Sequence, residues 1–164
     1  MELTRAAVQR ERTDAGDLLG ELRLADFRDI SEALVLAHGG RVQMCYFDPP
    51  YATGQSFRCR LMVGEGDWKS GKSSLSLPAY DDPAEEEAYV NMMREALTLA
   101  RELLTDTGVM FLHVDWRMSA QMRLLMDDVF GRKNFLNEIV WAYQSGGRAT
   151  RFFSRKHDTI LLYR

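Results

Sequence analysis

The sequence has little of what a secreted, membrane or metal-binding protein carries. It contains two cysteines in 164 residues, Cys45 and Cys59, and their spacing matches neither a disulfide framework nor a zinc site. No apolar run approaches the roughly 18 residues that a membrane span needs, and the first residues, rich in Arg and Glu, lack the apolar segment of a signal peptide. The sequence therefore predicts a soluble, cytoplasmic protein with no metal site and no membrane partner.

Charge is divided unevenly along the chain, although the formal net charge is only −3. Residues 132–164 hold seven basic and two acidic side chains, a net +5, so the remaining residues carry −8. A basic segment suits a surface that faces phosphates, and it suits an ordinary solvated face equally well. Charge alone therefore leaves a nucleic-acid partner open.

Apolar runs and turn residues predict a single α/β domain. Strand and helix candidates alternate along the chain as in a parallel α/β sheet. The strands are expected at 22–26, 42–47 and 109–115, and the helices at about 31–38, 82–105 and 119–130. Segments 139–142 and 159–163 are joined too closely for a crossover helix and are expected to form an antiparallel hairpin. Residues 1–20 are expected to be an N-terminal extension with a peripheral helix, and residues 52–80 a long mobile loop.

The most informative segment is Asp48-Pro49-Pro50-Tyr51, which directly follows the apolar run Val42–Phe47. Each proline lacks an N–H and has a fixed φ, so this turn cannot continue a strand ladder and its carbonyls stay free to accept hydrogen bonds. The Asp48 carboxylate and the Pro49 carbonyl can both accept from an exocyclic amine, and Tyr51 offers a ring face for stacking. The tetrapeptide predicts a pocket for a flat ring that bears an amine.

Two more acids, Asp26 and Asp115, end expected strands. Ligands of open α/β sheets lie beyond the carboxyl ends of the strands, so the edge that carries these acids is the predicted site. Taken singly, Asp26 and Asp115 fit a turn or cap role at least as well as a functional one. Asp48 is different, because a capping Asp needs no Pro-Pro-Tyr behind it.

The motif resembles the catalytic motif of adenine-specific DNA N6-methyltransferases, in particular the modification subunits of type III restriction systems. Thr53, Gly54 and Phe57 extend the likeness beyond Tyr51. Other segments that recur in the same order in such enzymes are 92–104, 108–115, 124–131, 134–135, 139–141 and 156–161. The resemblance runs from about residue 22 to residue 164. It implies a Rossmann-like methyltransferase sheet, mostly parallel with a C-terminal antiparallel hairpin, in a partial catalytic domain over residues 21–164.

The resemblance also implies the reaction, in which a methyl group passes from S-adenosylmethionine to the N6 amine of an adenine swung out of DNA. Catalysis would then rest on Asp48, Pro49, Pro50 and Tyr51. Contacts with the base or the DNA would come from Thr53, Phe57, Asp115, Gly147, Arg148, Arg151, Arg155 and Lys156. For the four basic residues in this set, a solvated surface role fits equally well.

The cofactor side of the resemblance is incomplete. Members of this group hold the methionine half of the cofactor with a Phe-x-Gly-x-Gly loop near the C-terminus, and this sequence has no such loop. Asp26 matches a Gly-Asp segment that approaches the cofactor's adenine, but Ala25 replaces the glycine. The chain is therefore expected to be a fragment, a split gene product or a remnant. Its expected partners are DNA and a chain that carries the missing loop, or a restriction subunit.

Two other functions stay open on the residues alone. One is a non-catalytic DNA-binding module, and the other is an amino methyltransferase that acts on RNA or on cytosine. The aspartate at the first motif position favours adenine, since the similar cytosine enzymes more often have serine there. Nothing in these residues decides between DNA and RNA.

Overall fold

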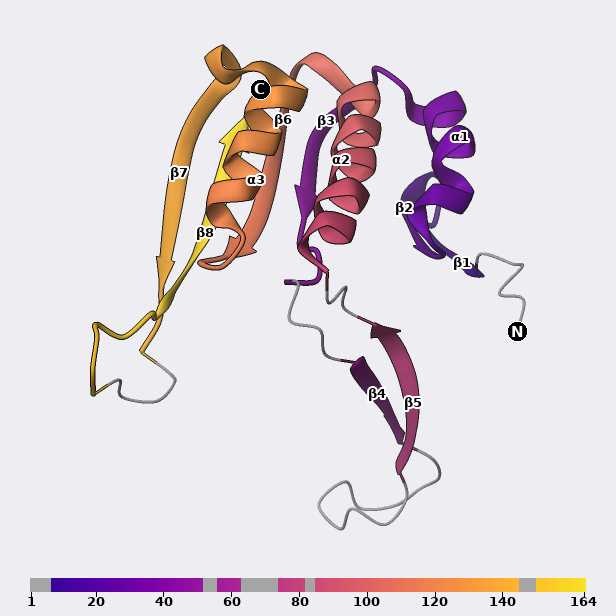
Figure 1. Ribbon diagram of the computed structural model, residues 1–164. Helices are drawn as coiled ribbons and strands as arrows, with labels where there is room; N and C mark the ends of the chain where they lie inside the picture. Colours follow the sequence, from indigo (N-terminus) through magenta and orange to yellow (C-terminus); the bar gives the residue numbers. More distant parts are fainter. Residues whose placement is uncertain (1–6, 52–55, 63–73, 82–84, 145–149) are drawn as a thin grey trace.

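The computed structural model describes residues 7–51, 56–62, 74–81, 85–144 and 150–164. Four strands form the central sheet: β3 (Val42–Phe47), β6 (Leu104–Asp115), β7 (Phe135–Ala142) and β8 (His157–Tyr163). They lie in the order β3-β6-β8-β7 (Figure 1). β3 runs parallel to β6, whereas β8 is antiparallel to both β6 and β7. The expected β7–β8 hairpin is confirmed.

The described strands run in the expected directions: β3, β6 and β7 point the same way, and β8 of the C-terminal hairpin is reversed. One of the three pairings in the central sheet is parallel, because β8 inserts between β6 and β7. The strand expected at 22–26 is absent from this sheet. An α/β fold as such is confirmed.

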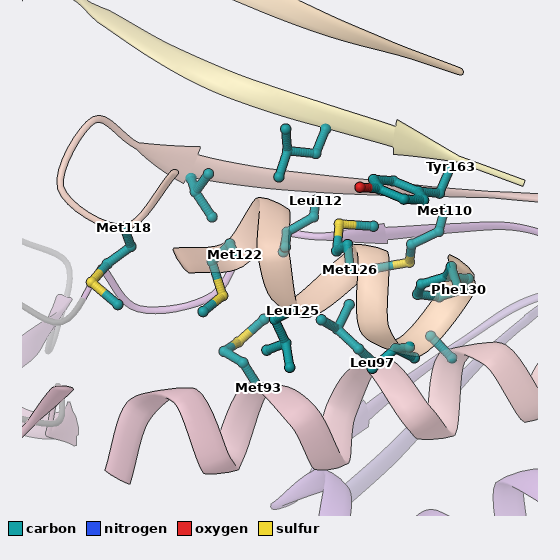
Figure 2. Packing of buried hydrophobic residues seen from close by; sticks show 14 of the residues in the cluster. Met93, Leu97, Met110, Leu112, Met118, Met122, Leu125, Met126, Phe130 and Tyr163 are labelled. Carbon is teal, nitrogen blue, oxygen red and sulfur yellow. The ribbon is translucent and has the colours of Figure 1, made fainter. Parts of the chain in front are cut away.

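Two helices cover one face of the sheet: α2 (Glu86–Leu103) and α3 (Ser119–Met126), the second extended by a π-helical turn over Asp127–Gly131 (Figure 1). Alternate residues of β6 point at these helices and are buried, as the two-residue period of a strand requires. The apolar stripes expected on the two helices face the same core (Figure 2). The core includes Met93, Leu97, Met110, Leu112, Val114, Met122, Leu125, Met126, Phe130 and Tyr163.

Gly131 ends the π-helical turn at a φ of +89°, a conformation that side chains with a Cβ rarely adopt. A short 3-10 turn, Arg132–Asn134, then leads into β7. None of the described helices combines the length and the apolar character that a membrane crossing requires.

The N-terminal region differs from expectation. β1 (Ala7–Arg12) and β2 (Leu18–Leu24) form an antiparallel pair of their own, so a peripheral helix is wrong for residues 7–20. Opposite charges face each other across the pair, with Arg10 Nε 2.6 Å from Glu21 Oε2. Cross-strand charge pairs of this kind stabilise a hairpin and carry no helical period.

Helix α1 (Phe27–His38) begins four residues before the expected start at Ser31. The cap is Asp26, whose Oδ1 accepts a hydrogen bond from the Arg28 backbone N–H at 3.0 Å. The helix ends at Gly39, as expected.

The segment between the motif and α2 also contains strands. β4 (Ser56–Met62) and β5 (Ser74–Asp81) pair in antiparallel fashion in a third, separate sheet. The prediction of a loop over residues 52–80 is therefore wrong for these two stretches, which are strands. The missed signal is the alternation of Phe57, Cys59 and Leu61 with polar residues, which is typical of a strand.

Candidate functional site at the end of strand β3

Strand register places the site at one edge of the central sheet. Since β3 and β6 are parallel and Phe47 pairs with Leu112, Asp48 emerges beside His113. The antiparallel strand β8 starts at this same edge, where Asp158 pairs with Asp115 on β6 and with Trp141 on β7. Residues far apart in the sequence are thus brought together beyond the carboxyl end of β3.

Asp48 is held through one carboxylate oxygen. The Tyr51 hydroxyl donates to Asp48 Oδ1 at 2.9 Å, and His113 Nδ1 lies 3.3 Å from the same oxygen. Among the described residues, no hydrogen-bond donor contacts Oδ2, and 59% of the side chain is exposed. The carboxylate is therefore oriented by the protein and still has an oxygen available to a ligand.

The surroundings of Tyr51 favour the protonated form of its hydroxyl. Burial raises the pKa of Tyr51, and the hydrogen bond to Asp48 raises it further. Its ring meets the His113 ring edge-on, with centroids 5.8 Å apart and planes at 67°. Tyr51 is accordingly a fixed donor to Asp48 in addition to being an aromatic surface.

His113 connects two carboxylates. Its Nε2 lies 3.5 Å from Asp158 Oδ2, at the outer limit of a hydrogen bond, and both side chains are largely buried. The Trp141 ring stacks on the imidazole with centroids 6.4 Å apart and planes at 19°. The Tyr46 hydroxyl approaches Nδ1 at 3.4 Å. Side chains from β3, β7, β8 and the motif therefore surround the His113 imidazole.

His113, Asp158 and Trp141 are site residues that the sequence reasoning missed. The available signal was His113 itself, a polar residue at an alternate position inside an apolar strand. Its helix-facing neighbours Leu112 and Val114 are fully buried, so His113 points to the opposite face of the sheet. That face is also exposed at Tyr46 and Trp141.

Asp115 shares this edge, but its carboxylate is already engaged. The side chain is 6% exposed, with Arg117 Nε 2.6 Å from Oδ2 and the Arg117 backbone N–H 2.9 Å from Oδ1. Both oxygens thus organise the turn after β6. The structure gives Asp115 a turn role, one of the two readings left open by the sequence.

Asp26 lies elsewhere, so the expectation that three acids share one edge of the sheet is wrong for this residue. It follows β2, outside the central sheet, and its carboxylate accepts from Arg28 Nε at 2.9 Å as well as capping α1. These hydrogen bonds from Arg28 lower the pKa of Asp26 to about 2.

The other expected site residues are only partly brought together. Pro49 and Pro50 are half-buried beside Asp48, and Phe57 is in β4. The Arg155 guanidinium carbon lies 4.0 Å over the Trp116 ring, and Lys156 Nζ donates to the Gln144 carbonyl at 3.2 Å. Arg151 is exposed. Thr53, Gly147 and Arg148 lie outside the described residues.

No three His, Cys, Asp or Glu side chains gather as a metal-ion site within the part of the chain that the structure describes. The chemistry that this edge offers is that of oriented hydrogen-bond acceptors next to aromatic rings. A carboxylate and a proline carbonyl can both receive the protons of one amine. The arrangement suits a planar ligand with an exocyclic amine.

Known proteins resemble this chain over most of its length. A family model described as DNA methylase matches residues 42–164, which includes the whole central sheet. The type II methyltransferase M.EcaI of Enterobacter cloacae is 34% identical over 130 residues, 79% of this chain and 26% of that protein.

Two type III restriction-modification enzymes give further matches. The EcoPI Mod subunit of Escherichia phage P1 is 29% identical over 170 residues, covering 94% of this chain and 25% of that protein. The EcoP15I Mod subunit of Escherichia coli is 26% identical over 152 residues, covering 84% of this chain and 23% of that protein. The chain spans about a quarter of the length of these curated relatives.

Proposed function

Because the chain belongs to the DNA methylase family, we propose that it carries the target-base half of an adenine-specific DNA N6-methyltransferase. The observation that supports this most directly is the state of Asp48, whose Oδ1 is held by Tyr51 at 2.9 Å while Oδ2 has no described partner. The N6 amine of an extruded adenine would donate one hydrogen bond to Asp48 and one to the Pro49 carbonyl. The methyl group would come from S-adenosylmethionine.

The energies of these contacts are sufficient to hold a flipped base. Extrusion from the duplex costs a few kcal/mol, and stacking against an aromatic ring returns about 1 to 3 kcal/mol. A hydrogen bond from the amine to the charged Asp48 adds about 1.5 to 3 kcal/mol. The two acceptors would also fix the amine's direction and draw its nitrogen towards tetrahedral geometry, which would leave the nitrogen lone pair available to a methyl donor. Positioning is thus the main contribution of these residues.

Asp48 has two roles in this proposal. It orients the amine before transfer, and it can accept the proton that the nitrogen loses once it has gained a methyl group. His113, 3.3 Å from Oδ1 and linked in turn to Asp158, keeps the carboxylate from rotating. We assign His113 and Asp158 as positioning residues, because neither belongs to the motif that receives the base.

The described residues do not form a complete site for S-adenosylmethionine. At the site edge, β3 leads to Asp48-Pro49-Pro50-Tyr51 and β6 leads to Asp115 and the turn before α3; neither is followed by a glycine-rich turn that opens a helix. Asp26, the one residue that matches a cofactor segment, is tied to Arg28. We therefore derive no step through the cofactor, and we propose that its loop comes from a segment or chain outside this sequence.

Residues 21–164 would then be part of a Rossmann-like catalytic domain, with residues 1–20 as an extension. The names of the Mod subunits place them in type III restriction-modification enzymes, so a restriction subunit is a proposed partner as well as DNA. Residues 145–156, between β7 and β8, would lie near the DNA backbone and include Gly147, Arg148, Arg151, Arg155 and Lys156.

The test is reconstitution. The chain is produced together with the remaining segment of a similar modification subunit, incubated with DNA and S-adenosylmethionine, and the DNA is digested for mass spectrometry. N6-methyladenine is expected with the unaltered chain and not with Asp48→Ala. The matched control is Asp14→Ala, which removes an exposed carboxylate remote in sequence from the site.

Other products would assign other functions. Undiminished N6-methyladenine with Asp48→Ala, or methylcytosine in its place, would contradict the proposal. Methylation of RNA in preference to DNA would favour the RNA enzyme. The non-catalytic DNA-binding module predicts DNA binding with no methylated base in any arm of the experiment.

A further inference from the structure

An exposed pair of aromatic side chains lies in the segment that leads into β8. Phe153 is 97% exposed and Phe152 is 61% exposed. Residues 150–156, which lead into β8, extend past the end of that strand (Figure 1). A single exposed aromatic ring is ordinary on a protein surface, but two consecutive rings exposed to this degree form an apolar patch that a ligand could cover.

The patch is surrounded by positive charge. Residues 150–157 contain three basic side chains, Arg151, Arg155 and Lys156, and no acidic one. Within the described residues, no carboxylate forms an ion pair with Arg151 or Arg155. An apolar partner surface on a protein would leave these two charges without compensation. A polyanion with flat apolar faces fits both features.

Arg155 links the patch to the base site. Its guanidinium carbon lies 4.0 Å from the centre of the Trp116 ring and 5.0 Å from the centre of the Phe152 ring, so the group is close to both rings. A guanidinium is planar, so one that stacks through its face still has its in-plane N–H groups available to donate to a phosphate. Trp116 directly follows Asp115 at the end of β6, so this cluster is continuous with the edge of the sheet that carries Asp48.

We propose that Phe152 and Phe153 stack on bases of a locally unpaired DNA strand whose phosphates contact Arg151 and Arg155. Aromatic rings in a basic groove bind single strands in this way, because every base has a face on which a ring can stack. In a closed duplex those faces are covered by neighbouring bases. The aromatic pair therefore does not bind an intact double helix; it binds the unpaired strand next to an extruded nucleotide. The inference rests on the proposed function in taking DNA as the substrate.

Fluorescence anisotropy of labelled single-stranded and duplex DNA, measured over a series of salt concentrations, tests this proposal. Phe153→Ala is expected to weaken single-strand binding about tenfold, within the range that alanine substitution gives for base stacking, without a change in the salt dependence. Arg151→Gln is expected to lower the slope of log affinity against log salt by about 0.7, the value for one phosphate of a single strand. The two substitutions thus separate stacking from charge.

Two controls make the result specific. Leu36→Ala removes a side chain on α1 that is 91% exposed, and it should leave DNA binding unchanged. Phe153→Tyr keeps an aromatic ring and should bind within about twofold of the unaltered chain. No DNA binding by the unaltered chain, normal binding by Phe153→Ala, equal losses for Phe153→Tyr and Phe153→Ala, or tighter binding of RNA than of DNA would each overturn the proposal.

Failure of this inference is distinguishable from failure of the proposed function. Asp48→Ala is expected to abolish methylation while the aromatic pair still binds a single strand. A Phe153 effect on binding without any methylated product would support the inference and contradict the enzyme. Methylation that depends on Asp48, with no Phe153 effect on binding, would do the reverse.

Discussion

The Tyr51 hydroxyl donates a hydrogen bond of 2.9 Å to the Asp48 carboxylate, so the first and last residues of the motif are bound to each other. In a reconstituted methyltransferase, we expect Tyr51→Phe to lower kcat about ten- to a hundredfold. The loss corresponds to a hydrogen bond to a charged group, worth about 1.5 to 3 kcal/mol. KM for DNA should change little because the ring remains. Tyr51→Ala should also raise KM, and equal kcat values for the unaltered chain and Tyr51→Phe would contradict the assignment.

His113 provides a second prediction, because it lies 3.3 Å from Asp48 and 3.5 Å from Asp158. His113→Ala should reduce kcat about tenfold, since a carboxylate free to rotate is less often correctly placed for the amine. His113→Asn, which can still donate a hydrogen bond, should recover part of the loss. Steady-state kinetics give the split between kcat and KM. His38→Ala, an exposed histidine at the end of α1, is the matched control; a loss as large for His38→Ala would indicate a general effect on folding.

Asp26 predicts a pH dependence of stability. Hydrogen bonds from Arg28 lower the pKa of Asp26 to about 2 in the folded chain. A group with a lowered folded-state pKa contributes stability that is complete above its unfolded-state pKa, about 3.9, and is lost as the pH falls towards its folded-state value. The contribution should be below about 1 kcal/mol, because 40% of the side chain is exposed to solvent.

Denaturant unfolding of the unaltered chain and of Asp26→Asn, at several pH values from above about 4 to about 2, measures this contribution. Asparagine is also a good N-cap, so the substitution isolates the charge. The stability difference should shrink as the pH falls, and Arg28→Gln should remove most of it. A difference that stays constant over this range would count against the Asp26–Arg28 ion pair as its source.

The core between α2 and α3 gives a stability prediction. Leu97 is fully buried, and Leu97→Ala should reduce the free energy of unfolding by about 2 to 5 kcal/mol through lost burial and the cavity left behind. Leu124 on α3 is 70% exposed, and Leu124→Ala should change stability by less than about 0.5 kcal/mol. Chemical unfolding compares the two; similar losses would contradict the packing seen in Figure 2.

Much of the fold could be predicted wherever a local pattern carries the information. The strand Val42–Phe47 was predicted at its observed bounds, and the apolar spacing of α2 and α3 identified the faces that form the core. The prediction failed for residues 7–20, where strands occur in place of a helix. It failed there because the charge pairs that stabilise this region form between the two strands. The order of residues along the chain does not show which charged side chains will face each other across a strand pair.

The sequence by itself determined the motif Asp48-Pro49-Pro50-Tyr51 and its place after a strand, because these depend on neighbouring residues, and it determined the family resemblance, because that depends on the order of short segments along the chain. Only the tertiary structure decided that β8 runs between β6 and β7, and hence that His113 lies between Asp48 and Asp158. It also decided that Asp115 is closed off by Arg117 and that Asp26 belongs to a helix cap. The physical reason is register: which side chains meet across a sheet depends on how distant strands align, and that alignment is set by burial of the whole core.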